Sequence, residues 1–425
     1  MKGNNVLSSI SSCRLCDSSC VTLVWSFGNT PLANAFVAAD SLDDPEIIAP
    51  LDVCRCKHCQ LVQLRHTVSP EVLFRNYLYV SSTSQTFMAH FNAYASQCIK
   101  RFGLTPQTLV VEIGSNDGVL LKPLSARGIP VIGVEPAEKI AAQANLEGIK
   151  TIPTFFTPAV AEQIRQQQGT AKVITCNNAF AHIPDLDDIV QGIKCLMTED
   201  SVFVFEVQYL TDLLEKNLFD LVYHEHLFYY HLSPLILFFS KYGLKIFDVE
   251  RTSVHGGSIR VFVECEHGPY VVTEGVKEML SAENEAGLNT DLPYFAFADR
   301  IRQNKQKIKS LLRHIKDQGK RVVGYGAPAK ATTLMYTFEI GKETLEYIVD
   351  DDRRFKQGRF MPGSHIPIVE PARLLADKPD YCLILAWNFA EPIMKSHARF
   401  LQQGGQFIIP IPTPRVIQNE SSNFN

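Results

Sequence analysis

VVEIGSNDGVLL, residues Val110–Leu121, is the stretch that decides the fold of this chain. An apolar run leads directly into Gly114, a second glycine follows at Gly118, and the apolar residues then resume. This pattern is typical of a buried strand that turns tightly into a helix, and doubly wound sheets bind ligands at the carboxyl ends of such strands. The stretch therefore predicts an α/β sheet with a ligand-binding edge.

Short apolar runs alternate with helical stretches on the C-terminal side of this strand. They lie at 131–136, 172–180, 201–210 and 259–265 and predict parallel strands joined by crossover helices. A polar helix is expected over 299–319, and four more apolar runs follow it, which predicts a second doubly wound sheet. The stretch between the two blocks, 266–298, has mixed charges and two prolines, so we expect it to be a connector.

Six of the 11 cysteines lie in the first sixty residues, which indicates a small N-terminal module. Cys13 and Cys16 form one CxxC pair, and Cys56 and Cys59 form a second one, with 39 residues between Cys16 and Cys56. Two such pairs supply four thiolates to one tetrahedral Zn²⁺, and a site with four protein ligands is structural because no position stays open for water. Cys54 is expected to be a spare buried thiol. The alternative is a set of unligated buried cysteines.

Composition narrows the class of protein. The chain has 425 residues, 46% of them hydrophobic and 20% charged, a net charge of −4, and no apparent stripe of Lys and Arg. A nucleic-acid partner is therefore not expected, and a small-molecule substrate is. We also expect no membrane span, because no apolar run has the necessary length, and a cytoplasmic location, because the N-terminus lacks a secretory pattern. A monomer or small homo-oligomer is expected.

The predicted ligand edge favours a ribose without a diphosphate. Glu135 ends the next strand 21 residues after Gly114, where a carboxylate accepts hydrogen bonds from ribose hydroxyls. The loop lacks a full GxGxxG, and Asp117 would repel a pyrophosphate. S-adenosylmethionine fits this edge better, whereas the alternative is an ordinary turn of a sheet. The candidate cofactor-binding residues are Glu112, Gly114, Asn116, Asp117, Gly118, Glu135 and Asn178.

Two later segments are rich in polar side chains. YHEHLFYYHL, Tyr223–Leu232, gathers three histidines, and HGGSIR follows at His255–Arg260. In the first segment, His224 and His226 would share one face of a strand and could bind a catalytic metal. We expect Tyr229, Tyr230 and His231 to be packing residues. The second segment is either a substrate-facing turn, with His255 and Arg260 as contacts, or a structural turn.

The second sheet repeats the order of strand, glycine turn and helix in RVVGYGAPAK, which ends at Lys330. Backbone N–H groups at a helix start together with a lysine suit a diphosphate. Arg353, Arg354 and Lys356 follow the next strand and either clamp a nucleotide or form a solvated loop. Tyr325, Trp387 and Phe389 either stack on a base or fill the sheet edge.

These motifs together resemble one family, the sugar C-methyltransferases of deoxysugar biosynthesis, which methylate carbon 3 of nucleotide-linked 4-keto-6-deoxysugars. The resemblance covers nearly the whole chain and includes both CxxC pairs, EIGSNDG, GVEP, NNAFAHI, YHEH, HGGSIRV, GYGAPAK, KQGRFMPGSHIPI and AWNF. It implies a zinc-binding domain, a class I methyltransferase domain of Rossmann-like fold, and a C-terminal Rossmann-like domain for the nucleotide of the substrate. We place these domains at 1–75, 76–265 and 299–415, with the connector at 266–298 and a tail at 416–425.

The resemblance also implies the catalytic residues, which are Tyr223, Glu225, His226 and His182. Methylating carbon requires a carbanion equivalent, so a proton beside the ketone must be removed and the enolate must be held. We expect His226 to be the base, Tyr223 to stabilise the oxyanion and Glu225 to orient an imidazole or relay the proton. Two alternative hypotheses for the function are a metal- or nicotinamide-dependent enzyme that modifies nucleotide sugars and a non-catalytic zinc-ribbon adaptor. The sugar, the nucleotide, the stereochemistry and the pathway product are left open.

Overall fold

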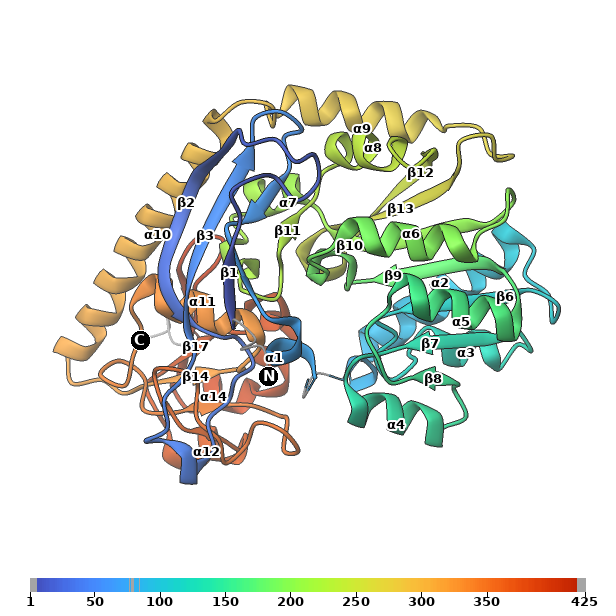
Figure 1. Cartoon of the computed structure of the whole chain (residues 1–425). Coiled ribbons are helices and arrows are strands. Elements are labelled where there is room, and N and C mark those ends of the chain that lie inside the picture. The colour runs from blue at the N-terminus through green and yellow to red at the C-terminus, as the bar shows by residue number, and fades with distance from the viewer. Residues whose placement is uncertain (1–5, 76, 78–79, 84, 419–425) are drawn as a thin grey trace.

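The computed structural model describes residues 6–75, 77, 80–83 and 85–418. Figure 1 shows the N-terminal strands beside the C-terminal domain in one half of the molecule. The central sheet and its helices form the other half. The stretch NESSNFN, expected to be part of a tail, lies outside the described residues. No helix in the described part of the chain is long and apolar enough to span a membrane.

The central sheet has seven strands in the order β12-β13-β10-β9-β6-β7-β8. Its first strand, β6, is wholly buried, as the apolar run in the opening stretch predicted. The strands are β6 (Leu109–Ile113), β7 (Val131–Val134), β8 (Thr151–Ile152), β9 (Ala171–Asn177), β10 (Val202–Gln208), β12 (Leu244–Thr252) and β13 (Ser258–Cys265). The strand order reverses between β6 and β9, so the predicted ligand edge is the switch point of the sheet.

One expectation for this sheet is wrong. Strand β13 runs antiparallel to both β10 and β12, whereas the sequence predicted parallel strands throughout. The connection from β12 to β13 is the short turn η5 (Val254–Gly256), which leaves no room for a crossover helix. Alternating apolar residues cannot distinguish the two directions.

Helices cover the sheet and are mostly short. They are α2 (Gln85–Phe102), α3 (Leu121–Ser125), α4 (Glu138–Leu146), α5 (Pro158–Gln168), α6 (Leu186–Leu196), α7 (Leu210–Glu215) and α8 (Leu232–Ser240), with the 3₁₀ turns η3 (Phe180–His182) and η4 (Phe219–Leu221). Thr157 and Asp185 cap α5 and α6 by accepting a hydrogen bond from a backbone N–H of the first turn. The predicted doubly wound architecture of the central domain is confirmed by this sheet and its crossover helices.

The N-terminal domain is built on a four-stranded sheet in the order β11-β4-β3-β2. Its elements are β1 (Leu7–Ser9), β2 (Val21–Pro31), η1 (Ala39–Ser41), β3 (Ile48–Cys56), β4 (Val62–Leu64), β5 (His66–Val68), α1 (Pro70–Phe74) and η2 (Ser81–Thr83). The edge strand β11 (Phe228–Tyr229) comes from the YHEHLFYYHL segment, so this segment is paired into the zinc-binding domain.

The predicted connector, 266–298, contains helix α9 (Glu274–Glu285) and the start of α10 (Leu292–Asp317). Glu283 of α9 is buried and lies 3.1 Å from His231, and its carboxylate also accepts hydrogen bonds from the backbone N–H groups of Leu232 and Ser233. His231 is thus a satisfied packing residue. Figure 1 shows α10 running along β2 toward the C-terminal domain.

The C-terminal sheet has six strands in the order β16-β15-β14-β17-β18-β19. Its elements are β14 (Val322–Tyr325), α11 (Ala329–Phe338), β15 (Ile348–Val349), β16 (Ile368–Val369), α12 (Ala372–Asp377), β17 (Tyr381–Ile384), η6 (Trp387–Phe389), α13 (Ala390–Ser396), α14 (Ala398–Gln402), β18 (Gln406–Ile409) and β19 (Arg415–Ile417). All neighbours are parallel except β18 and β19. Strand β19 extends this sheet into residues that the sequence assigned to the tail.

Candidate active site

The four predicted zinc ligands lie together. The Sγ atoms of Cys13, Cys16, Cys56 and Cys59 are all within 4.8 Å of one another. Two of the separations, Cys13 to Cys59 and Cys16 to Cys56, are 3.6 Å. Tetrahedral Zn–S bonds of about 2.3 Å place sulfurs roughly 3.8 Å apart, so this cluster fits one Zn²⁺.

Cys54, the expected spare thiol, is buried outside this cluster and accepts a hydrogen bond from Arg65 Nε at 3.4 Å. The alternative pair His224 and His226 does not form a metal site. These residues lie in a turn, not in a strand. His224 Nε2 faces the carbonyl of Ala49 at 3.2 Å, and His226 Nδ1 faces the carbonyl of Leu221 at 2.7 Å. The expectation that they share a strand face is wrong.

The carboxyl edge of the central sheet is shaped by Gly114. Its φ is +68°, and a Cβ at this position would lie 2.6 Å from the Cβ of Ala179. No real Cβ contact is that short, so the loop after β6 and the loop after β9 approach each other only because residue 114 lacks a side chain. Gly118 has a φ of +77° and turns the chain into the next helix.

Side-chain oxygens gather at the same edge. Both carboxylate oxygens of Glu135 accept backbone hydrogen bonds at 2.8 Å, from Asn116 and Ala137, which closes the loop over the end of β7. Glu112 Oε1 accepts a bond from Asn177 at 3.2 Å, and burial raises the pKa of Glu112 to about 8. Four other carboxylate and amide oxygens at this edge are buried and have no hydrogen-bond partner among the described residues: Glu112 Oε2, Asp117 Oδ1, Asn177 Oδ1 and Asn178 Oδ1.

A substitution of Gly114 tests this edge. Gly114→Ala is expected to weaken binding of S-adenosylhomocysteine about tenfold or more, because a left-handed alanine costs about 1–2 kcal/mol and its Cβ also displaces Ala179 beside Asn178. The matched control is Gly128→Ala, which has a φ of +78° but no atom within 4 Å of the added Cβ. Isothermal titration measures both affinities, and equal losses in the two variants would contradict the close approach.

The candidate base, His226, has a fixed orientation. Its Nδ1 lies 2.7 Å from the carbonyl oxygen of Leu221. Because a carbonyl only accepts, Nδ1 carries the proton and Nε2 keeps the free lone pair. The imidazole is buried, with its ring centroid 4.0 Å from that of Tyr223 and 5.0 Å from that of His182. The geometry therefore presents a neutral imidazole nitrogen among aromatic rings.

Glu225 does not orient an imidazole, so this part of the prediction is wrong. Its two carboxylate oxygens accept hydrogen bonds from Asn34 Nδ2 at 2.8 Å and from Tyr77 Oη at 3.0 Å. The orienting partner of His226 is instead the Leu221 carbonyl. Glu225 thus ties the YHEH turn to the N-terminal domain.

Three residues of the N-terminal part of the chain were missed by the sequence analysis. Asn34 and Tyr77 hold Glu225, and Phe74 stacks on the His182 ring at a centroid distance of 5.4 Å. No local spacing connects these residues with YHEH, so one sequence alone carries no signal for them. The zinc-binding domain therefore contributes to the walls of the candidate active site.

Burial lowers the pKa of three histidines, His182, His226 and His255. The pKa of His226 is lowered well below its usual value, first by burial and next by the neighbouring His182. Burial lowers the pKa of both His182 and His255 to about 4. The pKa of Glu225 is raised to about 7 by burial. At neutral pH the three imidazoles are consequently neutral.

A pH profile tests this electrostatic arrangement. A base must be unprotonated, so the acid limb of kcat/KM is expected below pH 6.5, because the pKa of His226 is lowered and not raised. Ionisation of Glu225 adds at most an inflection near pH 7 to the profile of kcat/KM. Glu225→Gln is expected to remove this inflection without moving the acid limb below pH 6.5. Initial rates from pH 5 to 9 in both proteins measure this. A limb at or above pH 6.5 that persists in Glu225→Gln would contradict the assignment.

Arg260 is not in a substrate-facing turn, and its prediction as a substrate contact is wrong. It lies in β13 and is only 4% exposed. Its guanidinium donates to Glu206 at 2.8 Å and to Gln97 at 2.7 Å, and it lies over the Tyr94 ring. His255, by contrast, lies in the turn η5 with a φ of +54° and is half-buried.

Lys330 is also placed differently from the prediction. Instead of pointing out from the helix start toward a diphosphate, it is buried, with its Nζ 3.7 Å from the centroid of the Trp387 ring and 3.9 Å from Asp220 Oδ2. Burial lowers its pKa to about 8. Arg353 and Arg354 are exposed in the loop after β15.

Lys356 lies in the same loop as Arg353 and Arg354. Its ammonium is 3.4 Å from Asp350 Oδ2, so it is paired with a carboxylate of its own domain. The predicted nucleotide clamp is thus present as two exposed guanidiniums and one paired lysine, and its role stays a prediction.

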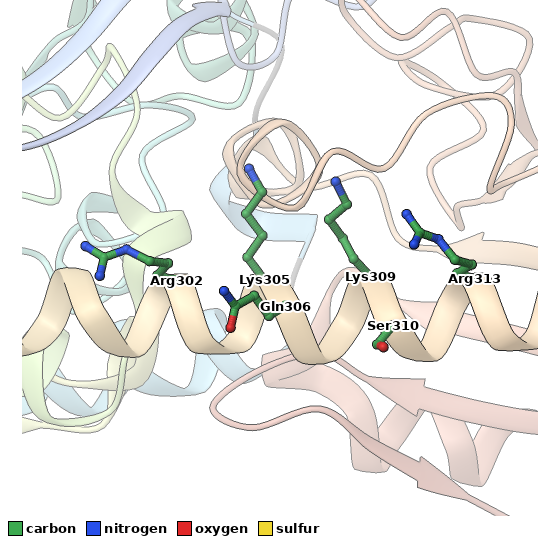
Figure 2. A pocket seen from close by; sticks show the side chains of 6 residues that line it. All are labelled: Arg302, Lys305, Gln306, Lys309, Ser310 and Arg313. Atoms are coloured by element: carbon green, nitrogen blue, oxygen red, sulfur yellow. The ribbon is translucent and has the colours of Figure 1, made fainter.

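A basic stripe on α10 was not predicted from the sequence. A hollow of about 470 Å³ lies along this helix. Figure 2 shows the six side chains that line it: Arg302, Lys305, Gln306, Lys309, Ser310 and Arg313. Lys305 and Lys309 both pair with Glu339, and Arg302 pairs with Asp299. These two carboxylates offset half of the four positive charges, and none of the predicted site residues lines this hollow, so it is a solvated helix face and not the centre of the chemistry.

Three protein families match successive parts of the chain. The family described as "Putative zinc binding domain" matches residues 13–74, "Methyltransferase domain" matches 87–249, and "C-methyltransferase C-terminal domain" matches 253–412. C-methyltransferase NovU of Streptomyces niveus is 40% identical over 418 residues, which are 98% of this chain and 99% of that protein. A ubiquinone biosynthesis O-methyltransferase of Bordetella avium is 26% identical over 90 residues, 21% of this chain and 37% of that protein.

Solved structures resemble the central part of the chain only distantly. Magnesium protoporphyrin IX methyltransferase from Synechocystis PCC 6803 with bound SAM has a TM-score of 0.33 and 14% identity, over 42% of this chain and 79% of that one. The PH0226 protein from Pyrococcus horikoshii OT3 has a TM-score of 0.36 and 13% identity, over 47% and 96%.

The doubly wound sheet, the oxygen-lined edge and the matched methyltransferase domain define an S-adenosylmethionine-dependent methyltransferase. The match to NovU along nearly the whole of both chains is more specific. The chain belongs to the C-methyltransferase family, as the motifs quoted above predicted. The predicted zinc is likewise confirmed by the matched zinc-binding domain together with the four clustered thiols.

The residues at the edge fit the cofactor. S-adenosylmethionine carries an ammonium, a sulfonium and ribose hydroxyls, which are cationic or donor groups, and the unpartnered oxygens of Asp117, Asn177 and Asn178 at the edge are acceptors. The predicted residues Glu112, Gly114, Asp117 and Asn178 lie at this edge, and Asn116, Gly118 and Glu135 shape its loop. Which oxygen contacts which atom of the cofactor stays a prediction.

Proposed function

We propose that this enzyme methylates carbon 3 of a nucleotide-diphosphate 4-keto-6-deoxysugar by deprotonating that carbon and presenting the enolate to the methyl donor. The observation that carries the proposal is the His226 tautomer, whose protonated Nδ1 is held by Leu221 O and whose Nε2 is a free base. An O-methyltransferase also deprotonates its substrate, and carbon is favoured as the methyl acceptor because the relative that is 40% identical over 98% of this chain is a C-methyltransferase. Carbon 3 and the nucleotide rest on the family resemblance.

His226 Nε2 takes the proton from the carbon beside the ketone. Burial lowers the pKa of His226, so the imidazole is a weaker base but is unprotonated and ready to accept a proton at neutral pH. General-base catalysis of this type contributes about 10²–10⁴ in rate. The Tyr223 ring lies at 4.0 Å from the His226 ring, so its hydroxyl is our candidate donor to the enolate oxygen. S-adenosylmethionine, when bound, supplies the electrophilic methyl group.

The other residues position the reactants. His182 stacks between Phe74 and His226 and walls the site from water. His255 lies in the β12–β13 turn and, with the exposed Arg353 and Arg354, is our candidate for contacts to the sugar and diphosphate. Holding carbon 3 in line with the methyl carbon and the sulfur of the methyl donor would supply a further rate advantage through proximity and orientation.

A mass-spectrometric assay tests the proposal. Purified enzyme with S-adenosylmethionine and a panel of thymidine- and guanosine-diphosphate 4-keto-6-deoxysugars is expected to add one methylene to a sugar. The matched control panel carries the same nucleotides with 4-hydroxy sugars, which lack the acidifying ketone and are expected to gain nothing. Methylation of the 4-hydroxy sugars, or of no sugar despite proven cofactor binding, would contradict the proposal.

A further inference from the structure

The C-terminal domain contacts the segment that precedes the YHEH turn. In this segment, 219–222, Asp220 Oδ2 accepts a hydrogen bond from Trp387 Nε1 at 2.5 Å. Two residues further on, the carbonyl of Val222 accepts a hydrogen bond from Thr333 Oγ1 at 2.7 Å. Trp387 belongs to η6 and Thr333 to α11, so two separate elements of the C-terminal domain hold the same four residues.

These contacts are buried, which makes them costly to lose. Asp220 is 0% exposed and Thr333 is 1% exposed. A carboxylate without water needs a donor and a counter-charge, and Trp387 supplies the donor while Lys330 Nζ lies 3.9 Å from Asp220 Oδ2. Lys330 in turn lies over the Trp387 ring at 3.7 Å, so the three side chains support one another.

Leu221 lies between Asp220 and Val222, the two residues that the C-terminal domain contacts. Its carbonyl oxygen is the partner of His226 Nδ1 at 2.7 Å. The Val222 N–H of the same peptide donates to Phe219 O at 3.0 Å, so the Leu221 carbonyl turns with the segment 219–222 as a unit. The contacts at Asp220 and Val222 hold that segment in place. The direction of the Leu221 carbonyl therefore depends on side chains of the C-terminal domain.

We propose that Asp220, Thr333 and Trp387 are positioning residues for His226, so that the docked C-terminal domain sets the orientation and tautomer of the base. This inference rests on the proposed function only in taking His226 as the base. It gives the C-terminal domain a part in proton abstraction in addition to any binding of the nucleotide. None of the three residues needs to touch the substrate.

The first test removes one hydroxyl. Thr333→Val is expected to lower kcat about 10- to 100-fold, since misplacing a catalytic group by about 1 Å costs this much. The KM values for sugar and cofactor are expected to stay within about twofold, and the isotope effect with sugar deuterated at the reacting carbon is expected to rise as proton abstraction becomes rate-limiting. Thr333→Ser keeps the donor and is expected to restore kcat.

A matched control lies one turn further along the same helix. Thr337 Oγ1 is buried and has no hydrogen-bond partner among the described residues, so Thr337→Val changes the same atoms in α11 without breaking a bond. Its kcat is expected to be unchanged. The inference would be overturned if Thr337→Val lost as much kcat as Thr333→Val does. It would also be overturned if Thr333→Val were unaffected, or if Thr333→Val raised the KM for the sugar and retained kcat.

A measurement without substrate keeps the inference separate from the proposed function. In ¹⁵N-histidine-labelled protein, with the His226 signal assigned by its absence in His226→Ala, Nδ1 is expected to carry the proton. Thr333→Val and Trp387→Phe are expected to give a mixture of tautomers, and Thr337→Val is not. If no sugar is methylated but the tautomer shifts, the proposed function fails and the inference stands; an unchanged tautomer in both variants overturns the inference.

Discussion

Replacing His226 with alanine is expected to lower kcat by about 10²–10⁴, the range for removal of a positioned general base. The expected loss is large because the neighbouring candidate bases are held in place by other contacts. The His182 ring is stacked between Phe74 and His226, and the carboxylate of Glu225 is held by Asn34 and Tyr77. Single-turnover assays with the responsive sugar measure the change.

The controls for this variant separate chemistry from folding. Affinity for S-adenosylhomocysteine is expected to be unchanged, because His226 lies outside the acceptor-lined edge that includes Glu112 and Asp117. Exchange of the carbon-bound proton with D₂O, measured without the methyl donor, is expected to be lost together with methylation. If exchange persisted while methylation was lost, the base would be a different residue and His226 would act later in the reaction.

The sheets and their ligand edge were predictable because their signals are local. Strands β6, β7, β9 and β10 are short, mostly apolar runs, and glycines mark the turn after β6. The paired CxxC motifs predicted the zinc cluster for the same reason, since each pair is a complete half-site within four residues. The direction of β13 was missed because alternation of side chains is identical in parallel and antiparallel strands.

The wall of the active site was not predictable because its contacts are distant in sequence. Asn34 is 191 residues from Glu225, and Tyr77 is 148 residues from it. The carbonyl of Leu221 is a backbone group, so no residue type marks its role. Arg260 was misassigned for a different reason: the glycines of HGGSIR indicated a turn, but the strand already begins at Ser258.

Loss of the zinc is expected to unfold the N-terminal domain and to abolish activity with it. Structural Zn²⁺ contributes about 10–16 kcal/mol of apparent binding free energy in small domains, far more than their usual stability. The four thiolates join the first CxxC loop to the end of β3, so their release frees β2, β3 and the loop to Asn34. Phe74, Tyr77 and Asn34 then no longer hold His182 and Glu225.

Cys56→Ser tests this dependence with Cys20→Ser as the matched control, because Cys20 is close in sequence but exposed and outside the cluster. Zinc content is expected to fall from one ion per chain to near zero only in Cys56→Ser, with a separate early unfolding transition in calorimetry. Binding of S-adenosylhomocysteine is expected to survive, because its edge belongs to the central sheet. A folded, zinc-free protein that has lost only its turnover would contradict a structural role and indicate that the metal takes part in the reaction.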